Sequence, residues 1–179
     1  FLGSHPAMDF LNTTLSPHGE RIEVIPDRAA FEAWLIAAGL IEADALARVK
    51  RNSDLAALDG VAAEARKLRA WSGDWIARWA ARPDDDYRTE VKRLNTPLAR
   101  LNCIRQLEPA ADGILIVDRP QIDTANDLIP LLAMQIALLI TEEDPSRIKR
   151  CAGTGCTLWF LDRTKARRRL FCSTTPCGN

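Results

Sequence analysis

The sequence predicts a mainly helical α+β fold with a small β-hairpin or sheet, followed by a C-terminal knuckle of two short turns and one short helix. Apolar residues recur at intervals of three and four over most of residues 27–141, which is the pattern of amphipathic helices. Residues 102–119 break that pattern with the composition of a hairpin. Four of the five cysteines lie at or after Cys151, which predicts a separate small unit.

Length and composition predict one sizeable domain with an appendage. The chain has 179 residues, of which 47% are apolar and 27% charged, as in ordinary globular proteins. We expect a mainly helical domain over 1–145, suited to sensing or dimerisation, and the knuckle over 146–179. The longest apolar stretch, Leu128–Ile140, is too short to cross a bilayer, so we expect a buried helix and no membrane partner.

The cysteine content and the start of the chain bear on localisation. No secretory signal is recognisable, and because the chain starts at Phe1 we expect the natural N-terminus to precede it. Five cysteines without an export signal predict a reducing cytoplasm and metal ligation rather than disulfides.

The first elements follow from turn and capping residues. Residues 8–15 predict a short helix or turn, and the polar–apolar alternation of residues 20–25 predicts a short strand. Asp27 is the expected N-cap of a helix that ends near Gly39, where glycine permits a left-handed C-cap. A second helix is expected over 42–51.

Two longer helices follow. The first spans about 54–82, with Asn52 or Ser53 as the expected N-cap and Pro83 after its end. The second follows a run of three aspartates, which suit a helix N-terminus. Pro97 is expected to bend this second helix or to end its first section.

A hairpin and an apolar helix complete the predicted body. Residues 102–108 and 114–118 alternate around a Pro-Ala-Ala-Asp-Gly turn. Asp123 or Thr124 is the expected cap of the apolar helix 125–141. Cys103 is expected to be a small buried residue, with a reactive thiol as the alternative.

The remaining cysteines are spaced C-x4-C-x15-C-x4-C, at Cys151, Cys156, Cys172 and Cys177. Two close pairs separated by a mid-length insert can bring four thiolates to the corners of a tetrahedron, the geometry that Zn²⁺ prefers. A catalytic zinc ordinarily keeps a non-thiolate ligand, and neither His5 nor His18 lies near these cysteines in sequence. The spacing therefore predicts one closed, structural Zn²⁺.

The insert between the cysteine pairs is strongly basic. We expect a short strand at 158–160 and a helix over 165–170 capped by Thr164. From Arg147 onward eight Lys or Arg accompany one acid, a net charge of +7, whereas the preceding residues carry −7. The zinc centre reduces the tail to about +5, because four thiolates and Zn²⁺ together carry −2. The candidate nucleic-acid contacts are Arg163, Lys165, Arg167, Arg168, Arg169 and Trp159.

Two interpretations of this segment remain open. In the first, the basic residues bind phosphates. Bound phosphates would offset the repulsion among five cations in seven residues and the unfavourable interaction of these cations with the macrodipole at a helix N-terminus. Alternatively, the cations balance the zinc centre and form ordinary solvated surface. Trp159 either stacks on a base or packs inside the knuckle.

The C-terminal pattern resembles the CGNR zinc finger, named for a closing Cys-Gly-Asn-Arg of which this chain contains Cys177-Gly178-Asn179. The opening Met8-Asp9-Phe10-Leu11-Asn12-Thr13 resembles the Leu-Asp-Phe-Val-Asn-Thr start of the ABATE domain, so the resemblance spans the whole chain. It implies zinc on the four cysteines, a bacterial stress-induced transcription regulator, and DNA as the partner of the basic helix. The chain ends before the final Arg of the motif.

The body contains a candidate pocket for a small-molecule effector. Asp9, Asn12 and Thr13 are polar among apolar neighbours, and Trp71, Trp75 and Trp79 recur every four residues on one helix. The structural alternative is that the polar residues cap and tie the N-terminal segment and the tryptophans belong to the core. The functional one is an apolar ligand cavity formed by Asp9, Asn12 and the three tryptophans.

Three classes of function compete. The first is a transcription regulator whose zinc-stabilised finger binds DNA while the body senses a ligand or forms a homodimer. The second is a zinc-stabilised RNA- or protein-interaction module without DNA binding. The third is an enzyme using Asp9 with His5 or His18, for which no nucleophile–base spacing or phosphate loop is present. We therefore expect a regulator and no catalytic residues.

Overall fold

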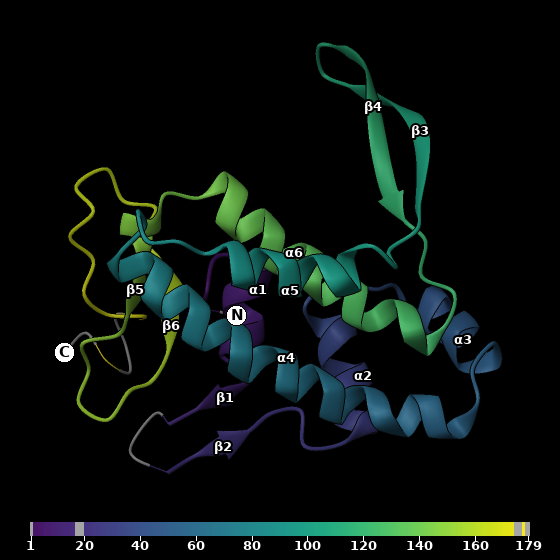
Figure 1. The fold of residues 1–179 in the computed structure, drawn as a ribbon, viewed down its shortest axis with the longest axis horizontal. Helices are drawn as coiled ribbons and strands as arrows, with labels where there is room; N and C mark the ends of the chain where they lie inside the picture. The colour runs from purple at the N-terminus through teal and green to yellow at the C-terminus, as the bar shows by residue number, and fades with distance from the viewer. Residues whose placement is uncertain (1, 17–19, 174–176, 178–179) are drawn as a thin grey trace.

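The computed structural model describes residues 2–16, 20–173 and 177. Within them the protein is mainly helical and contains two-stranded antiparallel sheets, which confirms the predicted α+β class (Figure 1). His18, Gly178 and Asn179 lie outside the described residues.

The N-terminal segment forms a short helix and then a small sheet. Helix α1 spans Pro6–Leu11, and strand β1 at Thr14–Leu15 pairs antiparallel with β2 at Ile22–Glu23. The segment expected to be one helix or turn thus divides into a helix and a strand. Helix α2 spans Arg28–Ala37, and the Asp27 carboxylate accepts the N–H of Ala30 at 2.9 Å, as predicted.

Helices α3 (Ala43–Arg51) and α4 (Leu55–Ala81) follow. The predicted caps of α4, Asn52 and Ser53, are wrong. Asp54 has the extended backbone of an N-cap and accepts the N–H of Ala57 at 2.7 Å, whereas the Ser53 hydroxyl accepts the N–H of Ala125 at 2.8 Å. Ser53 therefore joins two elements instead of starting one.

Helix α5 spans Arg88–Leu98 and includes Pro97 in its last turn, where the missing N–H costs only one helical hydrogen bond. Strands β3 (Cys103–Ala110) and β4 (Gly113–Pro120) then form the predicted hairpin. Figure 1 shows this hairpin projecting away from the helical body. Cys103 is exposed at the base of the hairpin, so its expected burial is wrong: the arm leaves the body at this residue.

The core forms around α6. A 3₁₀ turn, η1 (Ala125–Asp127), precedes α6 (Leu128–Glu142), which packs against α1, α4 and α5. The stretch Ala125–Glu142 is long and apolar enough to cross a bilayer by length and composition alone, but half of it is buried inside the protein. That burial is typical of a core helix, as the sequence predicted.

The C-terminal segment is anchored in the same core. The 3₁₀ turn η2 (Pro145–Arg147) leads into β5 (Ile148–Arg150), which pairs antiparallel with β6 (Trp159–Leu161). The side chains of Ile148, Trp159 and Leu161 are buried within the core cluster of the helical body. The predicted strand at 158–160 is therefore present, paired with a strand that the sequence did not reveal.

Candidate metal centre and basic segment

The four predicted zinc ligands converge. Their Sγ atoms all lie within 4.8 Å of one another, and those of Cys156 and Cys172 are 4.0 Å apart. A tetrahedral zinc with Zn–S bonds of about 2.3 Å requires sulfurs about 3.8 Å apart. The four sulfurs are thus slightly farther apart than a tetrahedral zinc requires, and they could reach that spacing without a change in the fold.

Backbone donors surround one of the sulfurs. Cys151 Sγ accepts the N–H of Gly153 at 3.4 Å and that of Cys172 at 3.3 Å. Burial by itself would raise the pKa of Cys151, but these donors outweigh it and lower the pKa to about 7. Burial and the neighbouring thiols raise the pKa of Cys172 and Cys177. A divalent cation supplies the charge that lets all four ionise together, so the donor set fits one structural Zn²⁺.

The loop between Cys151 and Cys156 depends on glycine. A Cβ on Gly153 would lie 3.1 Å from Cys177 Cβ and 3.2 Å from its Sγ, so a side chain there would press on the metal ligand. Gly155 has a φ of +73°, a left-handed conformation that favours glycine. Glycine is needed at position 153 because the backbone there lies close to Cys177, and at position 155 because its backbone is left-handed.

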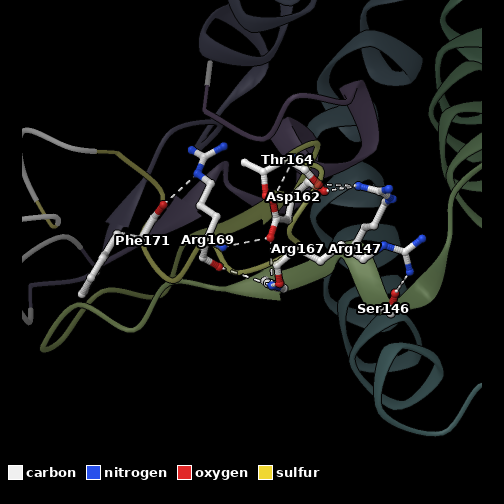
Figure 2. Close-up of polar contacts among 8 residues, drawn as sticks. Ser146, Arg147, Asp162, Thr164, Arg167, Arg169 and Phe171 are labelled. Carbon is white, nitrogen blue, oxygen red and sulfur yellow. Dashed lines mark hydrogen bonds and ion pairs between the residues drawn. The ribbon is translucent and has the colours of Figure 1, made fainter.

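Asp162 organises the basic segment. Its carboxylate is fully buried; Oδ1 accepts the N–H and hydroxyl of Thr164, at 3.0 and 2.6 Å. Oδ2 accepts from Lys149 Nζ at 2.9 Å and from the N–H of Arg169 at 3.0 Å. Figure 2 shows Asp162 at the centre of these contacts. Burial by itself would raise the pKa of Asp162, but the bonds from Thr164 and Lys149 hold it well below its usual range.

These contacts replace the helix predicted over 165–170, which is wrong. The described residues after β6 form a turn at 164–166 and then an irregular segment, with Arg167 at a φ of +51°. Thr164, the predicted helix cap, instead donates its N–H and hydroxyl to Asp162, and the N–H of Arg169 binds the same carboxylate. A loop wrapped around one carboxylate leaves these groups unavailable for a helix.

Two of the predicted nucleic-acid contacts form ion pairs with the end of the body. Arg163 lies 2.7 Å from Glu143, and Arg167 lies 2.6 Å from Asp144. Arg167 also donates to the Ser146 hydroxyl at 2.9 Å (Figure 2). All of these side chains except that of Glu143 are substantially exposed, and exposed pairs of this kind exchange readily for other partners.

Arg169 has a structural position. Its guanidinium lies 4.5 Å from the centre of the Phe160 ring and donates to the carbonyl oxygens of Phe171, at 2.9 Å, and Cys172. It therefore connects the basic segment to a metal ligand. This position agrees with the structural alternative rather than with a free phosphate contact.

Trp159 is not open for stacking on a base. Its side chain is buried, and the guanidinium of Arg150 lies 4.4 Å from the centre of its ring. Trp159 therefore does not stack on a base, and it packs in the core of the helical body rather than inside the knuckle, where the alternative placed it. Lys165 and Arg168, by contrast, are exposed and have no hydrogen bond or ion pair to any described residue.

The opening motif joins the body to the finger. The Asn12 side chain donates to the carbonyl oxygen of Trp159 and accepts its N–H, both at 2.8 Å. Asp9 accepts the N–H of Gly3 at 2.8 Å, and the carbonyl of Gly3 accepts the N–H of Leu161 at 3.0 Å. The structural alternative, in which these polar residues tie the N-terminal segment, is confirmed.

Thr13 belongs to a neighbouring buried network. Arg69 donates to the Thr13 hydroxyl at 2.7 Å and to both carboxylate oxygens of Glu23, at 2.7 and 2.6 Å. The hydrogen bonds from Arg69 lower the pKa of Glu23. His5 caps α1, because its Nδ1 accepts the N–H of Ala7 at 3.1 Å.

Asp9 and Asn12 also line an apolar cavity of about 560 Å³ between α1, α2 and the finger. Burial raises the pKa of Asp9, which contributes one of the few polar groups in the wall. Leu158 brings the finger to the cavity. The remaining lining residues are Leu2, Thr13, Leu15, Val24, Ala30, Ala33, Trp34 and Ala37.

The three predicted pocket tryptophans do not line this cavity. Trp75 is buried in the core, and Trp79 packs against it. Trp71 lies 5.5 Å from Trp75 between ring centres and is covered by the guanidinium of Arg93 at 4.5 Å. The core interpretation therefore holds for Trp75, whereas Trp71 and Trp79 are only partly buried against the core and Trp71 lines a separate cavity beside Arg93. Trp34 on α2 is the tryptophan in the wall of the cavity beside Asp9.

Sequence reasoning missed Asp162 and its partner Lys149. One signal was available: Asp162 is the single acid in a tail with eight cations. A lone carboxylate in such a segment is a candidate for a buried counterion that fixes the positions of the basic residues around it. The Arg69–Glu23 pair had no comparable signal, because its members lie 46 residues apart.

Comparisons with known proteins agree with this geometry. Residues 4–143 match a family model, ABATE, described as "Putative stress-induced transcription regulator", and residues 147–179 match the CGNR zinc finger. Neither description is that of an enzyme. A search of curated proteins found no match. The first match covers more than half of the chain, so the protein belongs to the ABATE family and ends in a CGNR zinc finger.

Proposed function

We propose that this protein is a transcription regulator that binds DNA through its zinc-stabilised finger, with the body over 1–145 sensing a small molecule. The observation that carries the proposal is the state of Lys165 and Arg168. Both are exposed and lack an anionic partner among the described residues, on a loop that Asp162 holds beside the metal centre. Exposed cations that have no partner in the described chain are suited to bind the phosphates of a nucleic-acid backbone.

Arg163 and Arg167 extend this surface. Their carboxylate partners, Glu143 and Asp144, belong to the end of the body, and phosphates would replace these carboxylates as partners of the two exposed arginines on binding. Arg169 instead connects the basic segment to Cys172, and Trp159 is buried in the body core. Judged by the described residues, the predicted contact set thus separates into two cations without a partner, two cations in ion pairs and two structural residues.

The decisive measurement is duplex DNA binding by fluorescence anisotropy over a salt series. The logarithm of the affinity falls with the logarithm of salt by about 0.9 per neutralised phosphate. The double variant Lys165→Ala/Arg168→Ala should therefore bind more weakly and lower the slope by about two. A matched control, Lys67→Ala/Lys92→Ala, removes two exposed cations from the body and should leave both quantities unchanged.

Equal losses in the two double variants would show that only overall charge matters, and absence of binding at low salt would reject the proposal. One observation favours the alternative module that binds RNA or a protein. The described part of the finger contains no helix that would enter a DNA groove. Stronger binding of single-stranded RNA than of duplex DNA in the same assay would establish that alternative.

The cavity defines the proposed effector as an apolar molecule bearing a hydrogen-bond donor or a positive charge, which Asp9 would bind. Because Leu158 belongs to the wall, an occupant contacts the finger directly. Titration of the intrinsic tryptophan fluorescence, to which Trp34 in the cavity wall contributes, with hexylamine and with hexanol tests this chemistry. Asp9→Asn should remove a preference for the amine, and Ala33→Phe, which narrows the cavity, should weaken both; no response to either compound would argue against this class of effector.

The proposal assigns the protein to the reducing cytoplasm, where thiolates remain available for zinc. It also assigns no catalysis. His5, a candidate for an enzymatic pair with Asp9, is engaged as the cap of α1.

A further inference from the structure

A cavity of about 300 Å³, here called the α4–α5 cavity, lies among α4, α5 and the start of α6. It shares no lining residue with the cavity beside Asp9. Its volume is at the lower end of the range for small-molecule sites. The apolar part of its wall consists of Leu68, Trp71, Pro97 and Ile129.

The charged part of the wall is mostly positive. Lys67, Arg93 and Arg100 line the α4–α5 cavity together with a single acid, Glu64, so the wall carries a net charge of +2. Residues 1–146 as a whole carry −7. The excess of cations is therefore a local feature that the composition of the body does not explain, and it favours an anionic occupant.

These cations have few partners of their own. None of the three side chains donates a hydrogen bond to a residue that the structure describes. Their one ion pair, between Arg100 and Glu64, is 4.0 Å long and joins side chains that are 53 and 57% exposed. Such a pair exchanges readily for another partner, so a bound anion would meet little competition.

Arg93 is the cation best placed to recognise a ligand. Its guanidinium lies over the Trp71 ring, 4.5 Å from the ring centre. This contact keeps the charge beside the apolar wall without occupying the N–H donors. A guanidinium offers those donors as a rigid fork, which matches the two oxygens of a carboxylate. The geometry therefore favours a carboxylate at Arg93.

We propose that the α4–α5 cavity binds a small aromatic carboxylate. Arg93 donates to the carboxylate, Arg100 adds a second positive charge, and the flat apolar body of the ligand covers the apolar wall. An inorganic anion would leave that wall in water and forgo the gain from its burial. This inference goes beyond the proposed function and depends neither on DNA binding nor on the cavity beside Asp9.

The expected affinity is modest, because the cavity is small and its cations are solvated. A ligand of about a dozen non-hydrogen atoms should have a dissociation constant on the order of 1 mM. A hydrogen bond to a charged group contributes about a factor of ten or more to binding. Removing the charge from either the ligand or Arg93 should therefore weaken binding by about tenfold.

Nuclear magnetic resonance of the zinc-loaded full chain tests the proposal with cinnamate as the probe. The indole N–H resonance of Trp71 is identified by its absence from the spectrum of Trp71→Phe. Cinnamate should shift this resonance saturably, whereas cinnamyl alcohol, which lacks the charge, and inorganic phosphate, which lacks the apolar body, should each bind at least about tenfold more weakly. An unmoved Trp71 resonance, or equal binding of the alcohol or of phosphate, would overturn the proposal.

Substitutions in the wall test the assignment of Arg93. Arg93→Gln should weaken cinnamate binding about tenfold, and Arg93→Lys, which keeps the charge but loses the fork, should recover only part of that loss. Thr96→Phe narrows the cavity and should also weaken binding. The matched control Lys92→Gln removes a charge from the neighbouring position of α5, outside the cavity wall, and should leave binding within about twofold.

All three substituted side chains are exposed, so circular dichroism should show folded variants. Equal weakening by Lys92→Gln would show that only the overall charge of the body matters and would reject the site. Unchanged binding by both Arg93→Gln and Thr96→Phe would place the ligand elsewhere and would reject it as well.

Discussion

Replacing Asp162 is the most direct test of how the basic segment is held. Four donors meet this one buried carboxylate: two from Thr164, one from Lys149 and one from Arg169. Asp162→Asn keeps the shape and removes the charge. The asparagine can turn its oxygen toward Lys149 and Arg169 and donate its amide to the Thr164 hydroxyl, which leaves the N–H of Thr164 without an acceptor.

The expected loss follows from that geometry. Removing one member of a buried ion pair costs about 3–5 kcal/mol. Lys149 retains 23% exposure and also donates to the carbonyl oxygens of Arg167 and Arg169, so its charge is partly compensated. We therefore expect Asp162→Asn to lower the free energy of unfolding by about 2–3 kcal/mol, and Asp162→Ala by about 3–5 kcal/mol. Either is a large part of the 5–15 kcal/mol typical of a domain.

The pH dependence has a defined sign. Because the pKa of Asp162 is lowered on folding, its stabilisation is fully present above the unfolded value near 3.9 and declines as pH falls toward the lower folded value. The difference in stability between wild type and Asp162→Asn should therefore narrow below about pH 4. The difference is the relevant quantity, since protonation of the thiols releases metal from both proteins.

Urea unfolding at pH 7, followed by tryptophan fluorescence and zinc content, measures the effect. Asp144→Asn is the matched control, because Asp144 also pairs with a basic residue of the finger but is exposed. The control should leave the unfolding midpoint almost unchanged. An Asp162→Asn protein as stable as wild type, or a control equally destabilised, would refute the assignment of Asp162 as the organising group.

Three further predictions concern the metal and the N-terminal motif. Cys156→Ser should abolish stoichiometric zinc and loosen the segments around the ligands while most helical circular dichroism remains; a full equivalent of zinc would refute the ligand set. Asn12→Ala leaves the N–H and C=O of Trp159 without partners and should lower the unfolding free energy by about 2–3 kcal/mol, and unchanged urea midpoints would contradict this. A Cβ at Gly3 would lie 2.6 Å from Met8 Cβ, so Gly3→Ala should destabilise by about 1–3 kcal/mol in a thermal melt, whereas a neutral effect would mean that the segment relaxes freely.

Much of the body was predictable because its signals are local. Asp27 and Gly39 bound α2 as expected, and the hairpin formed at the predicted turn. Caps were less predictable, because Ser53 and Asp54 are both good cap residues and only the position of Ala125 shows which one is engaged elsewhere. The failed helix over 165–170 has the same origin: Asp162 competes for the donors of the segment that follows it.

The sequence by itself determined the metal ligands, since the two short cysteine spacings require no knowledge of the body. It also determined the helical class, because apolar periodicity is a property of neighbouring residues. Only the tertiary structure decided which cations are free, which tryptophan lines a cavity and how the opening motif joins the finger. Those outcomes depend on contacts such as Asn12 with Trp159, 147 residues apart, and packing at that separation leaves no periodic trace in the chain.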